Sequence, residues 1–207
     1  MIPAPHAELI LPEVLQWSAF SPAHKVDLTS HAVRTSAGWW IFDPIPLHED
    51  SLERFRDDRT AAVVLTNENH ERDAAAWAAR FQAPIRASSL AQLGLDGVQR
   101  HPPVREIDGD WERIPLPGAA PGETAWFLPG RSLLVFGDAL VHLPGRGLEI
   151  LPDRYCQDPA QLRLSLRTLP PATHAVFAHG TPLLGDAADR IRLLLEADAG
   201  GRGSGRC

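Results

Sequence analysis

Three segments of the chain share one design, in which a short apolar run leads directly into polar residues. They span residues 63–73, 133–139 and 176–182. Short continuous apolar runs are typical of strands buried on both faces. The ends of such strands project side chains into a shared crevice, where α/β proteins build their sites. The sequence therefore predicts a layered sheet core with functional side chains at its strand ends.

The rest of the chain predicts further strands with helices inserted at wide intervals. Residues 26–33 and 38–44 form a predicted hairpin that ends at Pro44. Because strand hairpins mix with helices, the pattern favours α/β layers over a regular βαβ repeat. No G-x-G-x-x-G motif follows a strand, so a dinucleotide fold is not expected. Helices are predicted at 52–57, 71–82, 160–169 and 187–195, and further strands at 61–65, 85–87, 104–107, 111–114, 124–128, 132–136, 148–151 and 175–177.

Composition limits the partners and the compartment. The 207 residues carry a net charge of -6, which gives no reason to expect a nucleic-acid partner. No apolar run approaches the roughly 20 residues that span a bilayer, and no signal peptide is expected. With only two cysteines, a cytoplasmic location without a disulfide framework is the simplest interpretation. We expect one domain over residues 1–199, followed by a disordered Gly/Ser/Arg tail at 200–207.

In their order along the chain, these segments resemble the metallo-β-lactamase superfamily. That family has T-H-x-H-x-D-H after a buried strand, a histidine in G-H-x-P-G, an aspartate at a strand ending G-D, and a histidine in G-H-G. The corresponding segments here are residues 66–72, 118–125, 137–138 and 178–180. The resemblance covers roughly residues 26 to 195. It implies an α/β fold built of α+β layers, an αββα sandwich of the metallo-β-lactamase type.

The chain departs from the family at most of the metal-binding positions. Only Asp138 and His179 match, while the other positions hold Asn67, Asn69, Glu71, Arg72 and Ala119. Neutral amides are poor ligands for zinc or iron, and alanine supplies none. Arg72 would place a permanent positive charge where a second cation should sit. We therefore expect a hydrolase-like protein with a largely lost dinuclear site and without standard zinc hydrolase activity. The chain would then be catalytically silent, or would use the old crevice to bind a small molecule.

A second hypothesis keeps one metal ion. His70 follows Asn69 directly and, with Asp138, His179 and help from Glu71, could hold a single zinc, iron or manganese ion. Such an ion would activate water for hydrolysis of an ester, thioester or related small substrate. Whether the chain is an enzyme stays open between the two hypotheses, since no G-x-S-x-G elbow or Ser-His-Asp signature offers another mechanism.

Several of these residues also have purely structural explanations. Asn69 is favoured as a helix N-cap, which would leave His70 on the surface of the first turn. Arg72 could pair with Asp138 in the vacated metal volume. His142 follows Asp138 closely enough to be a substitute ligand, whereas His31 and His101 are expected on the surface. Adjacent Trp39 and Trp40 must face opposite ways on a strand, which hints at an exposed interface and a homodimer.

Overall fold

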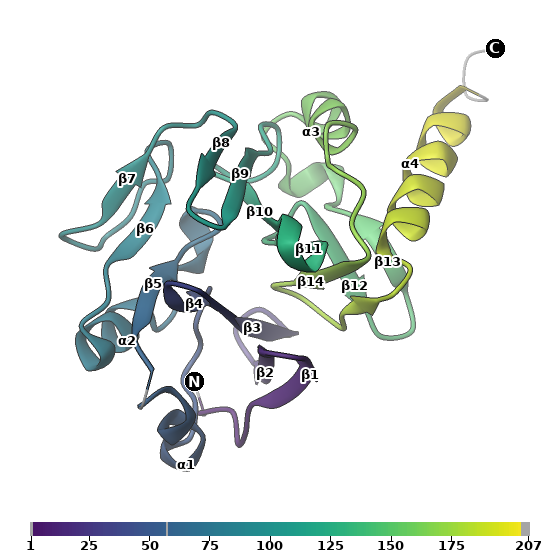
Figure 1. Ribbon diagram of the computed structural model, residues 1–207. Coiled ribbons are helices and arrows are strands. Elements are labelled where there is room, and N and C mark those ends of the chain that lie inside the picture. The colour runs from purple at the N-terminus through teal and green to yellow at the C-terminus, as the bar shows by residue number, and fades with distance from the viewer. Residues whose placement is uncertain (1, 57, 204–207) are drawn as a thin grey trace.

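Two mixed sheets face each other in the computed structural model, which describes residues 2–56 and 58–203 (Figure 1). The first sheet is antiparallel across β1–β4 and parallel across β4–β7. Its strands lie in chain order: β1 (Glu8–Leu11), β2 (Val14–Ser21), β3 (Val26–Thr35), β4 (Gly38–Phe42), β5 (Thr60–Val64), β6 (Ile85–Ser88) and β7 (Gln99–His101).

The second sheet has one parallel pair, β11 with β14, and is otherwise antiparallel. Its order is β15 (Leu183–Leu184), β14 (His174–Phe177), β11 (Leu133–Phe136), β10 (Thr124–Leu128), β9 (Trp111–Pro115) and β8 (Glu106–Asp108). A separate hairpin joins β12 (Leu140–Leu143) to β13 (Gly147–Ile150). The helices are α1 (Glu49–Leu52), α2 (Ala74–Phe81), α3 (Pro159–Leu166) and α4 (Ala187–Gly203).

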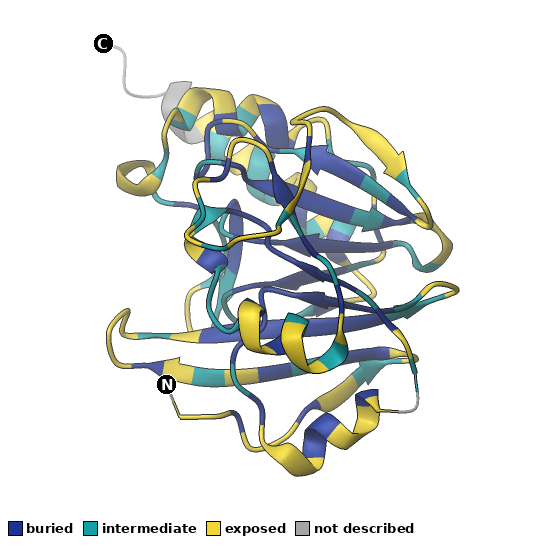
Figure 2. Cartoon of the chain, turned by 90° about the vertical axis from the view of Figure 1, so that its left-hand side faces the viewer, coloured by how far each residue is buried: buried dark blue, intermediate teal, exposed yellow. Residues whose placement is uncertain are grey.

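Three apolar cores hold these layers together. Trp40, Phe42, Trp111, Trp126 and Val135 belong to the core between the two sheets. A second core joins the outer face of the first sheet to α1 and α2, and a third joins the outer face of the second sheet to α3 and α4. Figure 2 shows the buried strands in the middle and helices with exposed outer faces on either side. The αββα sandwich that the sequence predicts is therefore present.

Both tryptophans of the Trp39-Trp40 pair are buried within the chain. Trp39 is 6% exposed and packs on Phe55 under the helices, while Trp40 is 5% exposed and packs between the sheets on Trp111 and Trp126. The expectation that one of them lies at an exposed interface was wrong, because a sheet in a sandwich has two buried faces. The suggestion of a homodimer rested on an exposed tryptophan, so this pair no longer supports it.

The predicted elements differ from the observed ones mainly at their ends. The helix predicted at 71–82 begins only at Ala74, because a 3₁₀ turn at Glu68–His70 and a left-handed Arg72, with φ of 39°, precede it. In the predicted tail, residues 200–203 continue α4, and residues 204–207 lie outside the described residues. Of the helices described, none is long and apolar enough to cross a membrane.

Candidate metal site

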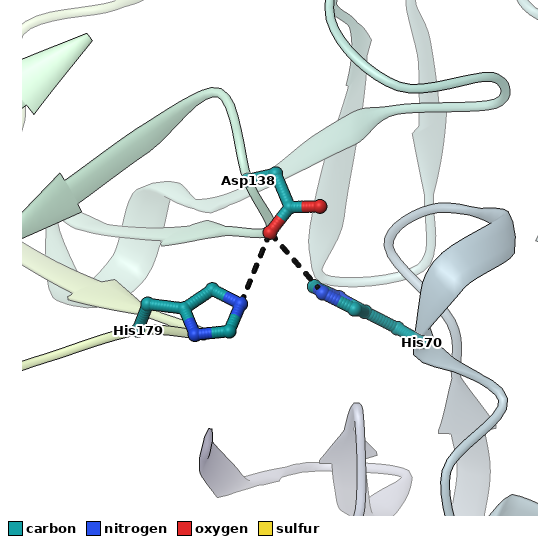
Figure 3. Close-up of side chains that lie close together, drawn as sticks. All are labelled: His70, Asp138 and His179. Carbon is teal, nitrogen blue, oxygen red and sulfur yellow. Dashed lines mark ion pairs between the residues drawn. The ribbon is translucent and has the colours of Figure 1, made fainter. Parts of the chain in front are cut away.

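Three strand ends meet at one edge of the sandwich. The parallel strands β11 and β14 pair Phe136 with Phe177, so the residues that follow them, Asp138 and His179, emerge side by side. The end of β5, from the first sheet, leads into Thr66, Asn67 and the turn that carries His70. Figure 3 shows the rings of His70 and His179 approaching Asp138 from two sides. The crevice that the sequence predicts at the strand ends thus brings these three residues together.

His70 points inward rather than lying on the surface. Its Nε2 lies 3.2 Å from Asp138 Oδ1, and Nε2 of His179 lies 3.1 Å from the same oxygen (Figure 3). One ligand atom from each of the three residues lies within 4.8 Å of the others. The expectation of a surface histidine was wrong, since His70 is only 3% exposed.

His70 points inward because Asn67 caps the 3₁₀ turn that carries it. Asn67, not Asn69, is the N-cap: its Oδ1 accepts a hydrogen bond from the backbone N–H of Asn69 at 2.8 Å. The expected N-cap of the helix at Asn69 is not formed, since α2 begins only after Asp73; instead the 3₁₀ turn capped by Asn67 directs His70 into the crevice. Asn69 itself is exposed and lines the cleft over the site.

The second ring nitrogen of each histidine is already engaged. Nδ1 of His179 lies 3.2 Å from the carbonyl oxygen of Asp27, which can only accept, so this nitrogen carries the proton. Nδ1 of His70 lies 3.0 Å from Asp43 Oδ2, a buried carboxylate oxygen that also accepts from the Thr66 hydroxyl at 2.6 Å. Both Nε2 atoms therefore face one Asp138 oxygen. Each must either carry an additional proton or share an ion with that oxygen.

Asn67 and Glu123 fix the other oxygen of Asp138, Oδ2. Glu123 was not predicted from the sequence. Nδ2 of Asn67 donates to Asp138 Oδ2 at 3.1 Å and to Oε2 of Glu123 at 2.7 Å. Oε1 of Glu123 accepts from the N–H of Ala139 at 2.9 Å. Asn67 and Glu123 thus aim Oδ1 of Asp138 at the two histidines. The signal for Glu123 is an acidic residue at the start of an apolar strand, within the segment compared with the second family region.

Close packing of these charges shifts their protonation. Burial and the charge of Arg72 act to lower the pKa of His70, but Asp138 and Asp43 outweigh them and raise it to about 9. Burial alone would raise the pKa of Asp138, yet the charge of His70 and the hydrogen bonds from both histidines hold it well below its usual value. Burial, followed by the charge of Asp138, raises the pKa of Glu123 to about 8.

Arg72 serves the backbone rather than Asp138. Its guanidinium donates to the carbonyl oxygens of Thr29 at 2.8 Å, Asp43 at 2.9 Å and Ala178 at 3.4 Å. The predicted ion pair with Asp138 is not formed, because the guanidinium is directed at these three carbonyl oxygens instead. Arg72 thus ties the first sheet to the end of β14 beside the candidate site.

The other candidate positions lie outside the cluster. The Glu71 carboxylate accepts from the N–H of Gly94, and Ala119 is fully buried in the core beneath α3 and α4. His142 Nδ1 contacts the carbonyl oxygen of Thr181 at 2.9 Å instead of Asp138. His31 and His101 are 2% and 6% exposed, so the expectation that they lie on the surface was wrong. Burial lowers the pKa of His31 to about 3 and of His101 to about 4.

A cleft of about 790 Å³ opens directly over the three residues. Asn69, His70, Asp138 and His179 contribute to its floor and walls, together with side chains of the β2–β3 turn and the β12–β13 hairpin. Small-molecule sites commonly measure about 300–1,000 Å³. The site is therefore accessible to a small ligand from one side.

Comparison with known proteins identifies the architecture. No family model matches the sequence, and no curated protein matches it. Solved structures do match. A metallo-beta-lactamase from Pontibacter korlensis shares 17% identity at a TM-score of 0.70, over 92% of this chain and 98% of its own. DIM-1 metallo-beta-lactamase shares 15% identity at a TM-score of 0.71, over 94% of this chain and 99% of its own. A metallo-beta-lactamase family protein from Thermus thermophilus shares 14% identity at a TM-score of 0.64, over 93% of this chain and 81% of its own. The chain therefore has the metallo-β-lactamase fold, as the order of its motifs implies.

Proposed function

We propose that the chain is a hydrolase-like protein whose cleft holds one metal ion instead of two. His70 Nε2, Asp138 Oδ1 and His179 Nε2 would be the ligands. One observation carries the proposal: both Nε2 atoms converge on a single carboxylate oxygen while both Nδ1 atoms have acceptors of their own. An ion would replace the two additional protons that this arrangement otherwise needs.

The donor set fits such an ion. Imidazole and carboxylate suit zinc, iron and manganese. Zinc binds these atoms at about 2.0–2.2 Å, so neighbouring ligands of a tetrahedral ion lie roughly 3.4 Å apart. The separations of 3.2 Å and 3.1 Å are close to that value. Three protein ligands leave a position open, as in catalytic rather than structural zinc sites.

The residues around the ligands support one ion and oppose a second. Asp43 holds Nδ1 of His70, and a carboxylate behind a ligating histidine is the usual device that fixes its ring and tautomer. Asn67 fixes the orientation of Asp138 in the same way. Arg72 adds a positive charge next to this group, and Asn67 is committed to Glu123 and Asp138, so no second set of ligands is left among the described residues here.

The reaction we propose is hydrolysis of an ester, thioester or related small substrate. A bound ion would supply a Lewis acid that polarises a carbonyl group and makes water more acidic. The chain itself provides the open cleft, keeps both histidines in one tautomer, and holds Asp138 in its charged form. The exposed amide of Asn69 lies in the same cleft and is placed to contact a substrate.

Metal content tests the proposal directly. Protein purified without chelator or affinity-tag metal is expected to contain close to one equivalent of zinc, iron or manganese by elemental analysis. Asp138→Ala and His179→Ala should each weaken binding by at least about 100-fold, since ligand loss exceeds the roughly 10–100-fold cost of losing a supporting residue. His142→Ala is the matched control, because its ring lies outside the cluster.

A metal-free protein that binds a small molecule in the cleft is the second candidate. It is favoured by the ion pair of His70 with Asp138, which balances the buried carboxylate without any metal. Absence of metal from the purified chain, together with no rise in melting temperature on adding zinc, iron or manganese, would rule out the one-ion proposal in favour of this one.

A further inference from the structure

The cleft over the candidate site has an apolar wall. Leu28 of β3, Val141 and Leu143 of β12, and Leu151 after β13 line it, and they come from both halves of the chain. Leu28 and Val141 are 4% and 8% exposed, so their side chains are held by the packing around them. Such a wall favours a ligand with an apolar segment, because burying that segment removes apolar surface from water.

The mouth of the same cleft is basic, although the whole chain has a net charge of -6. Lys25 of the β2–β3 turn, Arg146 of the β12–β13 turn and Arg154 of the turn at Asp153–Tyr155 all line it. Arg146 is paired with Glu149, while Arg154 lies over the ring of Tyr155 at 4.7 Å. No carboxylate among the described residues forms an ion pair with Lys25 or Arg154. The charges of Lys25 and Arg154 are thus not balanced by the two carboxylates of the cleft, since Glu149 pairs with Arg146 and Asp138 with the two histidines.

The turn that carries Lys25 is fixed rather than loose. Lys25 has a left-handed backbone with φ of 57°, and its N–H donates to the carbonyl oxygen of Ser21 at 2.7 Å. The hydroxyl of Ser21 also contacts Nδ1 of His24 at 2.8 Å. A non-glycine residue in this conformation is uncommon and costs about 1 kcal/mol or more, so such residues cluster at ligand-binding sites.

We infer that the substrate is a small molecule with an apolar acyl segment and one anionic group, a carboxylate or a phosphate. Lys25 and Arg154 would hold the anionic group at the mouth, the apolar wall would hold the acyl segment, and the scissile bond would lie over His70, Asp138 and His179. The assignment as substrate rests on the proposed function, whereas the binding preference does not depend on a metal.

Binding to the chelator-treated full chain tests this preference separately from hydrolysis. Octanoate, octyl phosphate and the uncharged octanamide are titrated by isothermal calorimetry at low ionic strength. We expect at least one of the two anions, octanoate or octyl phosphate, to bind about tenfold more tightly than octanamide. The stronger of the two identifies the anionic group.

Charge reversal locates the binding. Lys25→Glu combined with Arg154→Glu is expected to weaken binding of the anion about tenfold and to change octanamide less than twofold. Arg54→Glu with Arg167→Glu is the matched control, because both arginines are exposed, lie outside the cleft and give the same net charge. Raising the salt concentration should reduce the difference between anion and amide.

Three results would overturn the inference. They are equal affinity for the anions and octanamide, no binding of any of the three compounds, or anion binding that Lys25→Glu with Arg154→Glu leaves unchanged. The last result would place the anion at His70 and His179 instead of at the mouth of the cleft. Because metal is absent throughout, failure of the one-ion proposal appears in the metal analysis and not in these titrations.

Discussion

Arg72→Met is expected to lower the free energy of unfolding by about 3–5 kcal/mol. Its guanidinium donates to three carbonyl oxygens, on Thr29, Asp43 and Ala178, and methionine leaves all three without this donor. Hydrogen bonds that involve a charged group contribute roughly 1.5–3 kcal/mol each. The carbonyl oxygens of Asp43 and Ala178 keep a second donor, the Ser30 hydroxyl and the Thr29 N–H, so they add no cost of an unsatisfied acceptor. Urea denaturation followed by tryptophan fluorescence, with chelator present, measures the loss.

Two further variants separate the hydrogen bonds from charge alone. Arg72→Lys keeps the charge, but a single ammonium nitrogen cannot take the positions of both Nη1 and Nη2, so we expect an intermediate loss. Arg146→Met removes an exposed arginine paired only with nearby Glu149, and its effect should stay within about 1 kcal/mol. A change below about 1 kcal/mol in Arg72→Met itself would mean that the guanidinium does not tie β3, β4 and β14 together.

The strands buried on both faces were the parts of the fold that the sequence predicted best. The strand β10 matches its predicted bounds of 124–128, β11 and β14 differ from theirs by one residue at one end, and β5 is shifted by one residue. Each is a continuous apolar run, because both of its faces are covered. In contrast, β2 mixes Gln16 and Ser18 with apolar residues and was not predicted, since its exposed positions obscure the pattern.

The site was predictable to the extent that it depends on strand ends. Asp138 and His179 follow from apolar runs that pair in parallel, but the direction of His70 depends on a 3₁₀ turn, capped by Asn67, that was not predicted. Glu123 was missed for a different reason: its partner Asn67 lies 56 residues away, and no local pattern joins them. Side-chain networks between distant segments exist only once both sheets have packed.

The charges of this network give the metal-free protein a distinct dependence on pH. His70 has a folded pKa of about 9 against an ordinary value of 6.5, so the folded state binds more protons between these values. The stability from this group is complete below pH 6.5 and is lost as pH rises through 9, by about 3 kcal/mol. Glu123, whose pKa is raised to about 8, acts in the same direction between pH 4.5 and 8.

The acidic partners act at the other end of the range. The pKa values of Asp138 and Asp43 are lowered, so their stabilising effect is present above about pH 4 and is lost as pH falls below it. Buried His31 and His101, whose pKa values are lowered to about 3 and about 4, add stability as pH rises towards 6.5. Chelator-treated protein should therefore be most stable near pH 6.5 and should lose stability from there up to about pH 9. Metal binding is expected to strengthen over the same rise, because the ligating histidines must give up their protons.

Two variants assign the alkaline loss to particular side chains. His70→Gln should flatten the profile between pH 6.5 and 9. Glu123→Gln should remove the part of the slope below pH 8 that belongs to Glu123, because glutamine does not titrate. It should also lower stability at every pH, because the amide nitrogen cannot accept from either Asn67 or Ala139. His48→Gln, an exposed histidine far from the cluster in sequence, should leave the profile unchanged. Urea denaturation at half-unit pH intervals measures all four proteins. A wild-type profile that is level from about pH 6.5 to 9 would show that His70 and Asp138 do not share a proton in the metal-free fold, and the charge-balanced alternative to a metal ion would fall with it.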